Sequence, residues 1–595
     1  MDAPNPAVQV VVSPDPLAHQ FHIRLTLEAP AQCVFRLPNW IRGSYLVRDF
    51  AKHVSGLVAE RDGVELPIER LDKSSFRVSA AAGALTLRYA VHAYDESVRK
   101  AFLDTRRGFF NASSLVYCPV GFERSGFELL IEKPAPEACA HWRVATALTA
   151  ITTDAAGFGH YHAADYETLI DSPVEMAAFQ RIDFTADGVP HTLTLSGRCA
   201  PDHARLASDI EKICIVQRQF FGHEPAMPRY WFLTNVTASG YGGLEHREST
   251  ALTCARNDLP RPGETGLRKE YLTFLGLVSH EYFHLWNVKR ITPQPFAESD
   301  LQAAAYSRDL WHYEGVTSYY DDLFLLRAGL IDAEVYLDLL AEGATRLERT
   351  PARHVHSLAD ASFETWIKYY QPDENSPNAS TNYYVKGALV ALCLDLVLRR
   401  DSQTSLDAVM QTLWQRYGRS NTPAPEGALE SVAAELSGRD LKPFFDAALR
   451  GTSELPLPET LASFGVLAVR RPAGSDADNG GRQVGTPASC MLGCKLKPDG
   501  SVAHVITGSP AQQVGLAGGD VLVALDGLSV SAGNFTRRLN GLKPGTPVEL
   551  LWFRGEELMR AMITPTAPVA DTWTLTLMTT LGSEVAARRK AWLGV

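Results

Sequence analysis

A run of 24 residues, LRKEYLTFLGLVSHEYFHLWNVKR at 267–290, has apolar residues at helical spacing. Pro and Gly bound it on both sides, in RPGETG and ITPQP, as is typical of helix ends. Its histidines lie among apolar residues, namely Leu275, Leu277, Val278, Phe283, Leu285 and Trp286. We therefore expect a largely buried helix, on which imidazole and carboxylate groups need partners.

The motif His280-Glu281-Tyr282-Phe283-His284 lies on this helix. Residues four apart share one face of a helix, so both imidazoles can reach one Zn²⁺ ion. Glu281 is one position further on and is poorly placed to be a third ligand. It is instead placed to act as the general base on a water molecule at the metal.

A catalytic zinc site has three protein ligands and one open position. Our candidate for the third ligand is Glu314, in the segment Trp311-His312-Tyr313-Glu314-Gly315, 30 residues after His284. We expect it on a second helix over residues 302–328, antiparallel to the first. His312 is the rival ligand, and the alternative for His312 is a hydrogen-bonded histidine with no metal role.

At 595 residues, the chain is too long for one compact core, and several domains are expected. Residues 1–185 predict a β-rich domain with strands at 21–29, 85–94 and 191–197, the last just beyond its boundary. Residues 186–455 predict a catalytic domain that becomes helical toward its end, with a helix at 204–222 and a strand at 230–236. We expect a linker at 456–487, with an exposed, loop-like stretch at 470–488, then a small β-rich unit at 488–570 and a tail at 571–595.

The net charge is −11, which disfavours a nucleic-acid partner because no basic excess is available to neutralise phosphates. No stretch approaches the roughly 20 apolar residues of a membrane span. The nine cysteines are scattered and odd in number, which indicates reduced thiols rather than a disulfide framework. No signal peptide is recognisable, so we expect a cytoplasmic protein, or a periplasmic one if a leader has been removed.

The segments HEYFHLWNVKRI at 280–291 and WHYEGVTSYY at 311–320 resemble the zinc-ligand segments of thermolysin-like gluzincins. Together with LPNWIRGSYLVRDF at 37–50, they resemble the glycyl aminopeptidase family that carries a C-terminal PDZ domain. Arg42 stands where that family would have Pro. The resemblance implies a multidomain α+β protein with a β-rich N-terminal domain, a thermolysin-like α/β-to-helical zinc domain and a PDZ-like β-barrel.

The segment Gly242-Gly243-Leu244-Glu245-His246 resembles the Gly-x-Met-Glu-Asn strand motif of the wider aminopeptidase-N group. The resemblance implies that Glu245 binds the free α-amine of a substrate and that Gly242 and Gly243 belong to the substrate-binding strand. An extended peptide can pair with such a strand edge, while a carboxylate at its end pairs with the ammonium group. This chain has Leu-Glu-His where the motif has Met-Glu-Asn, and this difference affects the pocket that determines substrate specificity.

The segment Tyr383-Tyr384-Val385-Lys386-Gly387, which opens a helix at 386–398, resembles the Tyr-x-Lys-Gly segment of aminopeptidase-N-like enzymes. That resemblance implies that Tyr384 donates to the oxyanion of the transition state. The alternative is an aromatic residue that packs at the start of the helix.

The C-terminal unit carries Gly508-Ser509-Pro510-Ala511, Gly519-Asp520-Val521-Leu522 and Asp526-Gly527, and so resembles a PDZ domain. The segment Met491-Leu492-Gly493-Cys494 is placed where such domains have their carboxylate-binding loop. This implies a peptide with a free C-terminus as a possible ligand of the module.

The sequence thus predicts a metalloaminopeptidase with one Zn²⁺ per chain, acting on peptides with a free N-terminus. The family resemblance implies a preference for small first residues, Gly or Ala. Two alternatives are open: an endopeptidase on the same scaffold, and an inactive scaffold that binds peptides through its PDZ-like module. Imidazole and carboxylate ligands also accept metals other than zinc.

Overall fold

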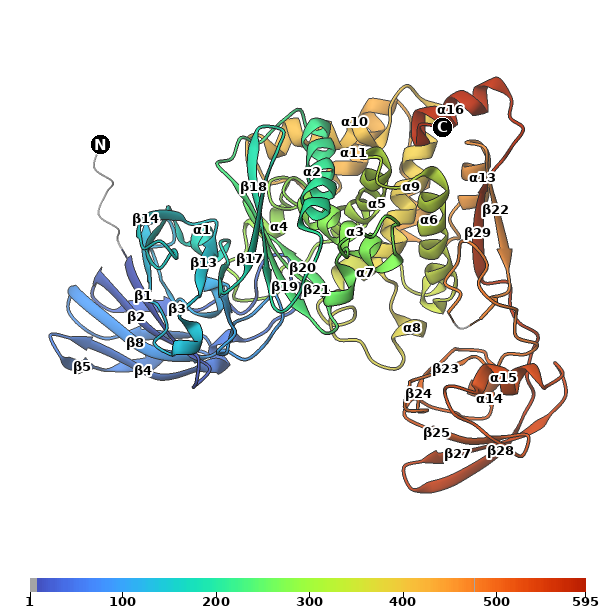
Figure 1. Ribbon diagram of the computed structural model, residues 1–595, viewed down its shortest axis with the longest axis horizontal. Coiled ribbons are helices and arrows are strands. Elements are labelled where there is room, and N and C mark those ends of the chain that lie inside the picture. Colours follow the sequence, from blue (N-terminus) through green and yellow to red (C-terminus); the bar gives the residue numbers. More distant parts are fainter. Residues whose placement is uncertain (1–7, 476) are drawn as a thin grey trace. The chain divides into compact units, whose positions relative to one another are not determined.

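The computed structural model describes residues 8–475 and 477–595, and the chain forms two compact units (Figure 1). One unit holds the residues up to Ala305 together with Trp414–Ala424. The other holds Tyr306–Leu413 and Pro425–Val595.

The first unit begins with an eight-stranded sheet in which buried and more exposed residues alternate along the central strands, as the sequence predicts. In β2, Phe21, Ile23 and Leu25 are buried, while the residues between them are exposed. The strand order is β14 (Thr149–Thr153), β15 (Gly159–Ala163), β12 (Phe127–Ile131), β1 (Val8–Asp15), β2 (Gln20–Ala29), β8 (Gly83–His92), β4 (Val54–Arg61) and β5 (Val64–Leu66).

Two four-stranded sheets also belong to the N-terminal part of this unit. One has the order β13 (Arg143–Thr146), β16 (Val174–Ala177), β10 (Arg107–Phe110) and β9 (Phe102–Leu103). The other has the order β11 (Cys118–Pro119), β3 (Cys33–Arg36), β7 (Ser75–Val78) and β6 (Ile68–Arg70). The predicted strands at 21–29 and 85–94 are confirmed as β2 and β8.

A five-stranded sheet follows in the same unit and has an edge strand that carries candidate substrate-binding residues. Its order is β17 (Gln180–Ala186), β18 (Val189–Ser196), β19 (Tyr230–Thr237), β21 (Ser249–Ala255) and β20 (Tyr241–Glu245). The strand β20 is antiparallel to β21 and lies at the edge of the sheet, with Glu245 as its last residue. The predicted strands at 191–197 and 230–236 are confirmed as β18 and β19.

Helices α2 (His203–Phe220) and α3 (Lys269–Phe283) pack against each other, and α3 also contacts β20 and β21 (Figure 1). The helix predicted at 204–222 is confirmed as α2. The helix predicted at 267–290 is correct in position but ends too late. It stops at Phe283, because His284 turns its Nδ1 to the carbonyl of Asn287 and Val288 has φ +119°, which no helix adopts.

The second unit begins with helices. Its central helix, α9 (Tyr383–Asp401), packs against most of the others, as Figure 1 shows. The surrounding helices are η5 (Trp311–Val316), α5 (Thr317–Arg327), α6 (Ala333–Glu348), α7 (Leu358–Phe363), α10 (Leu406–Leu413) and α13 (Leu457–Ala462). Further helices of this unit are η6 (Pro351–His354), α8 (Ser376–Ala379), α11 (Ala428–Ser437), α12 (Lys442–Phe445) and η8 (Asp446–Arg450). The stretch Ser376–Asp401 is long and apolar enough to span a membrane by composition, but 72% of its most apolar window is buried in the protein, as in a core helix.

The helix predicted at 302–328 starts later than expected, since the regular helical segment begins with η5 at Trp311. Residues 302 and 303 lie in the other unit, where their carbonyls accept side-chain donors instead of helical N–H groups. Asn39 Nδ2 donates to Gln302 O, and Trp40 Nε1 donates to Ala303 O, both at 2.8 Å. The segment 37–50 thus holds this stretch in a non-helical conformation.

The C-terminal β-rich residues form a small unit between two paired strands. Strand β22 (Val466–Arg471) pairs antiparallel with β29 (Thr572–Leu577). Between them lie the hairpin β23 (Cys494–Leu496) and β24 (Val502–Val505), a sheet of β26 (Leu528–Ser529), β25 (Val521–Leu525), β27 (Val548–Arg554) and β28 (Glu557–Ile563), and helices α14 (Pro510–Gln513) and α15 (Phe535–Asn540). Their apolar side chains form one separate core that includes Leu492, Leu550 and Trp552.

The expected loop-like linker is corrected by this pairing. The segment 456–487 contains α13 and β22, and the tail 571–595 contains β29 and α16 (Ser583–Leu593). Within the stretch expected to be exposed, Asp478 is fully buried and pairs with Arg471 Nη1 at 2.6 Å. Strands β22 and β29 form their backbone hydrogen bonds with each other, although they lie about 100 residues apart in the sequence. Local sequence patterns do not reveal a pairing over this distance.

Candidate metal centre and peptide-binding strand

The last turn of α3 carries the HExxH motif in the buried interior. His280, Glu281 and His284 have 9%, 5% and 1% of their surface exposed. The centroids of the two imidazole rings lie 4.7 Å apart. His284 Nδ1 lies 2.7 Å from the carbonyl oxygen of Asn287. Because a carbonyl only accepts, Nδ1 carries the proton and Nε2 keeps its lone pair for a metal.

Glu314 comes from η5 and is 2% exposed. The ligand atoms of His280, His284 and Glu314 all lie within 4.8 Å of one another. Two imidazole nitrogens and one carboxylate oxygen are the donors of a catalytic zinc site that keeps one position open. The residues therefore fit zinc, and the predicted ligand set comes together.

His312, the rival ligand, is also fully buried in η5, but it is not a member of this group among the described residues. Burial lowers the pKa of His312 to about 3, so its imidazole is neutral at physiological pH. The structure thus favours Glu314 as the third ligand.

The edge strand β20 lies directly against the motif helix. A Cβ atom added to Gly243 would collide with the carboxylate of Glu281. Only glycine allows this approach of backbone to carboxylate without a displacement of one of them. The predicted substrate strand and the predicted general base are therefore adjacent.

Glu245, at the end of the same strand, is 3% exposed. Its Oε1 has no hydrogen-bond partner within the part of the chain that the structure describes. A buried carboxylate oxygen without a partner is costly, and a cationic ligand would relieve that cost. The site thus has an anionic group that suits an ammonium group.

The carboxylate of Glu245 lies against Gly43, in the loop of the N-terminal signature. Gly43 has φ +86°, and a Cβ atom there would overlap Glu245 Oε1, with Cδ and Oε2 at 2.6 Å from it. The sequence predicts no link between the segment 37–50 and Glu245. Only the tertiary structure reveals this contact.

The two candidate tyrosines at the start of α9 differ in environment. Tyr383 is fully buried and its hydroxyl lies 3.1 Å from Thr365 Oγ1, whereas Tyr384 is partly exposed. Burial, and then the carboxylate of Glu314, raise the pKa of Tyr384 well above its usual value. Its phenol is therefore protonated and able to donate a hydrogen bond at neutral pH.

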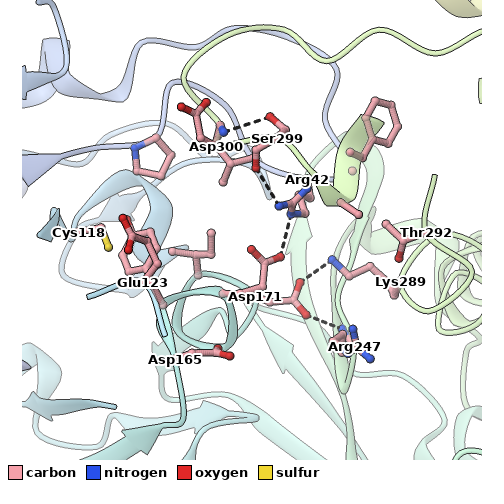
Figure 2. Close-up of a pocket in the computed structure, with 18 of the residues that line it drawn as sticks. Arg42, Cys118, Glu123, Asp165, Asp171, Arg247, Lys289, Thr292, Ser299 and Asp300 are labelled. Carbon is pink, nitrogen blue, oxygen red and sulfur yellow. Dashed lines mark hydrogen bonds and ion pairs between the residues drawn. The ribbon is translucent and has the colours of Figure 1, made fainter. Parts of the chain in front are cut away.

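A cavity of about 630 Å³ lies beside Glu245 in the first unit and is lined by charged residues (Figure 2). Arg42 extends into its centre, where Nε donates to Glu167 at 2.8 Å and Nη2 to the carbonyl of Ser299. Asp171 at its wall pairs with Lys289 Nζ at 2.6 Å. None of the three metal-ligand candidates lines this cavity, so it is distinct from the metal centre.

Sequence reasoning missed three residues close to the site. Tyr230 is fully buried, and its pKa is raised well above the usual value by burial first and then by the carboxylates of Glu281 and Glu245. Arg99 Nη2 donates to the carbonyl of Gly243 at 3.0 Å. Gly43 is the third. Each lies far in sequence from the motif it touches, so no local spacing could reveal it.

The sequence matches two family models. The model of the peptidase M61 N-terminal domain matches residues 9–178, and that of the M61 glycyl aminopeptidase matches residues 273–390. No curated protein matches the chain.

Among solved structures, an aminopeptidase N family protein from Idiomarina loihiensis is 36% identical, with a TM-score of 0.94, covering 98% of this chain and 100% of that chain. An M1 zinc metallopeptidase from Deinococcus radiodurans is 14% identical, with a TM-score of 0.47, over 76% of this chain and 94% of that one.

Proposed function

The chain belongs to the M61 glycyl aminopeptidase family, and on that premise we propose residue roles for its action as a zinc metalloaminopeptidase on peptides. His280, His284 and Glu314 hold the metal. Glu281 is the general base, Tyr384 the oxyanion donor and Glu245 the anchor for the substrate amine. The observation that carries the last role is the buried Oε1 of Glu245, which has no hydrogen-bond partner among residues 8–475 and 477–595, at the end of an edge strand.

Zinc, when bound by these residues, would supply a Lewis acid that could polarise the peptide carbonyl and lower the pKa of a water molecule. Glu281 accepts the proton of that water and passes it to the leaving amine. Its position against Gly243 brings the base to the level of the strand with which the substrate pairs. The phenol of Tyr384 donates to the oxyanion that develops on the scissile carbonyl.

Glu245 limits cleavage to the first peptide bond. An ammonium group paired with this buried carboxylate fixes the first residue, so the bond after it lies at the base and the metal. For the identity of that residue we propose Gly or Ala, supported by the family name and by the loop of Gly43 that closes behind Glu245.

The anchor role is tested with alanine p-nitroanilide and its N-acetyl derivative. Wild-type protein should cleave only the free amine, and Glu245→Gln should raise KM for it strongly while zinc content is unchanged. Equal cleavage of both compounds by the wild type would show an endopeptidase-like site and refute the anchor role.

For the C-terminal unit at 488–570 we propose a PDZ-like module that binds peptide C-termini. Supporting this, the loop that begins at Met491 leads into β23 at Cys494, and its Gly493 has φ +77° with Ser509 packed against it. Binding of a labelled peptide with a free C-terminal carboxylate to the full chain tests the proposal. No difference in affinity from the C-terminally amidated peptide would overturn it.

The domain boundaries at 185, 455, 487 and 570, and a cytoplasmic location, are further proposals. Limited proteolysis of the full chain tests the former, and cell fractionation tests the latter.

A further inference from the structure

A polar loop, residues 371–382, joins two tyrosines that meet at the start of α9. Tyr370 precedes the loop and Tyr384 follows it, and their hydroxyl oxygens lie 3.5 Å apart. Residues 371–380, with the sequence QPDENSPNAS, are all exposed or half-buried, so they contribute no buried side chain to a core. A segment of this kind depends on its polar contacts for a fixed conformation.

The tip of this loop, at α8, contacts the C-terminal unit at 488–570 through Asn378, and both belong to the second compact unit. Nδ2 of Asn378 donates to the carbonyl of Val505 at 2.9 Å, and its Oδ1 accepts from the N–H of Thr507 at 3.0 Å. One carboxamide thus pairs with two backbone groups at the end of β24, as the backbone of a neighbouring strand would. Because its donor and its acceptor are both used, the contact fixes the orientation of the loop as well as its distance.

A second contact, between Glu374 and Gly518, lies between the same two segments. A Cβ atom on Gly518 would lie 2.8 Å from the Cβ of Glu374. The φ of Gly518 lies outside the left-handed region, so other residues can adopt its backbone conformation. The absence of a side chain therefore serves the close packing of the two surfaces, and a side chain at this position would separate them.

We propose that Asn378 is a positioning residue, through which the C-terminal unit holds the loop 371–382 and thereby places the hydroxyl of Tyr384 for catalysis. This inference rests on the proposed role of Tyr384 as the oxyanion donor. Loss of the contact lets the loop move, and with it the two tyrosines at its ends. A misplaced oxyanion donor lowers kcat but not substrate affinity, because the oxyanion forms only in the transition state.

The first test measures kcat and KM on alanine p-nitroanilide. Asn378→Ala should lower kcat about tenfold or more, with KM and zinc content little changed. Gly518→Leu, which inserts a side chain between the two surfaces, should have the same effect. The matched controls are Asn540→Ala, which removes an acceptor for the N–H of Ser489 within the C-terminal unit, and Gly533→Leu, since a Cβ there meets no atom within 4 Å. Both controls should keep the wild-type kcat.

A double-mutant cycle separates positioning of Tyr384 from a general structural effect. In the Tyr384→Phe background, Asn378→Ala should cause no further fall in kcat, since the hydroxyl that it positions is absent. Equal fold-losses in the two backgrounds would overturn the proposal. Wild-type kcat in both Asn378→Ala and Gly518→Leu would also overturn it.

Hydrogen exchange of the full chain reports on the contact itself. The amide of Thr507 should be protected in the wild type and should exchange faster in Asn378→Ala, because its acceptor is removed. Unprotected exchange of this amide in the wild type would overturn the proposal.

Tyr384→Phe distinguishes the two levels of the argument. If this variant keeps the wild-type kcat, the role of Tyr384 fails together with the inference. If it lowers kcat and Asn378→Ala does not, only the inference about Asn378 fails.

Discussion

Gly315 and Gly387 bring the backbones of η5 and α9 into direct contact. A Cβ atom on Gly315 would lie 2.5 Å from the Cα of Gly387, and one on Gly387 would lie 2.9 Å from the Cα of Gly315. Glu314 precedes the first glycine, and Tyr384 lies almost one turn before the second. The glycine pair therefore determines how closely the proposed ligand and the proposed oxyanion donor approach.

Replacement of either glycine by alanine should separate the two helices. We expect Gly315→Ala to lower kcat/KM by about 10- to 100-fold, because a displacement of about 1 Å at a catalytic group has effects of that size. Gly343→Ala, in α6, is the control, since a Cβ there meets no atom within 4 Å. Similar activity of both variants would show that the close approach is unimportant.

Gly43→Ala should displace the carboxylate of Glu245. The expected result is a rise in KM for alanine p-nitroanilide of about tenfold, since the charge-assisted contact to the amine is weakened. Gly56→Ala controls for the strain of a positive φ, because Gly56 has φ +61° but open space around it. If both variants bind substrate equally poorly, backbone strain and not the contact with Glu245 explains the effect.

Glu281→Gln should leave the metal in place but remove the base. Loss of a general base lowers kcat by about 10²- to 10⁴-fold. Zinc content, measured by atomic absorption, should remain at one ion per chain. Undiminished hydrolysis would exclude the proposed mechanism.

Removal of the metal by a chelator should abolish activity and lower the melting temperature, because a ligand that binds only the folded state stabilises it. Added zinc should restore both. Glu314→Gln should weaken zinc retention, whereas His312→Gln should not, since His312 is outside the ligand group. The opposite result would make His312 the third ligand.

Asp309 should make stability depend on pH. Burial is the main cause that raises the pKa of Asp309 to about 7, while the N–H of Gly427 donates to its Oδ2 at 2.7 Å. In the unfolded chain this carboxyl ionises near pH 4, so its stabilising contribution is present below that pH and is lost as the pH rises through about 7. Thermal unfolding between pH 4 and 8 measures this loss.

Asp309→Asn keeps an acceptor for Gly427 but cannot ionise. At pH 8 its free energy of unfolding should exceed that of the wild type by on the order of 2 kcal/mol, so it should unfold at a higher temperature. At pH 4 the two proteins should differ little in stability. A constant difference across the pH range would rule out ionisation of Asp309 as the cause.

Local sequence patterns were sufficient to predict helices and strands whose formation depends on neighbouring residues. Alternation predicted β2 and β8, and helical periodicity predicted α2 and most of α3. These patterns did not predict where some of the helices begin and end. The segment at Gln302 and Ala303 is held by Asn39 and Trp40, more than 260 residues away in sequence, so tertiary hydrogen bonds override its helical tendency.

The spacing of His280 and His284 was enough to place them on one face, because residues four apart on a helix with 3.6 residues per turn lie on the same side. The sequence also supplied Glu314 as a third donor, although only by context. The distant groups that complete the site became known only from the folded chain: Gly43 lies against Glu245, Gly243 lies against Glu281, and Arg99 donates to the carbonyl of Gly243. These contacts depend on how strands and loops pack, and packing is a property of the whole chain that no local spacing encodes.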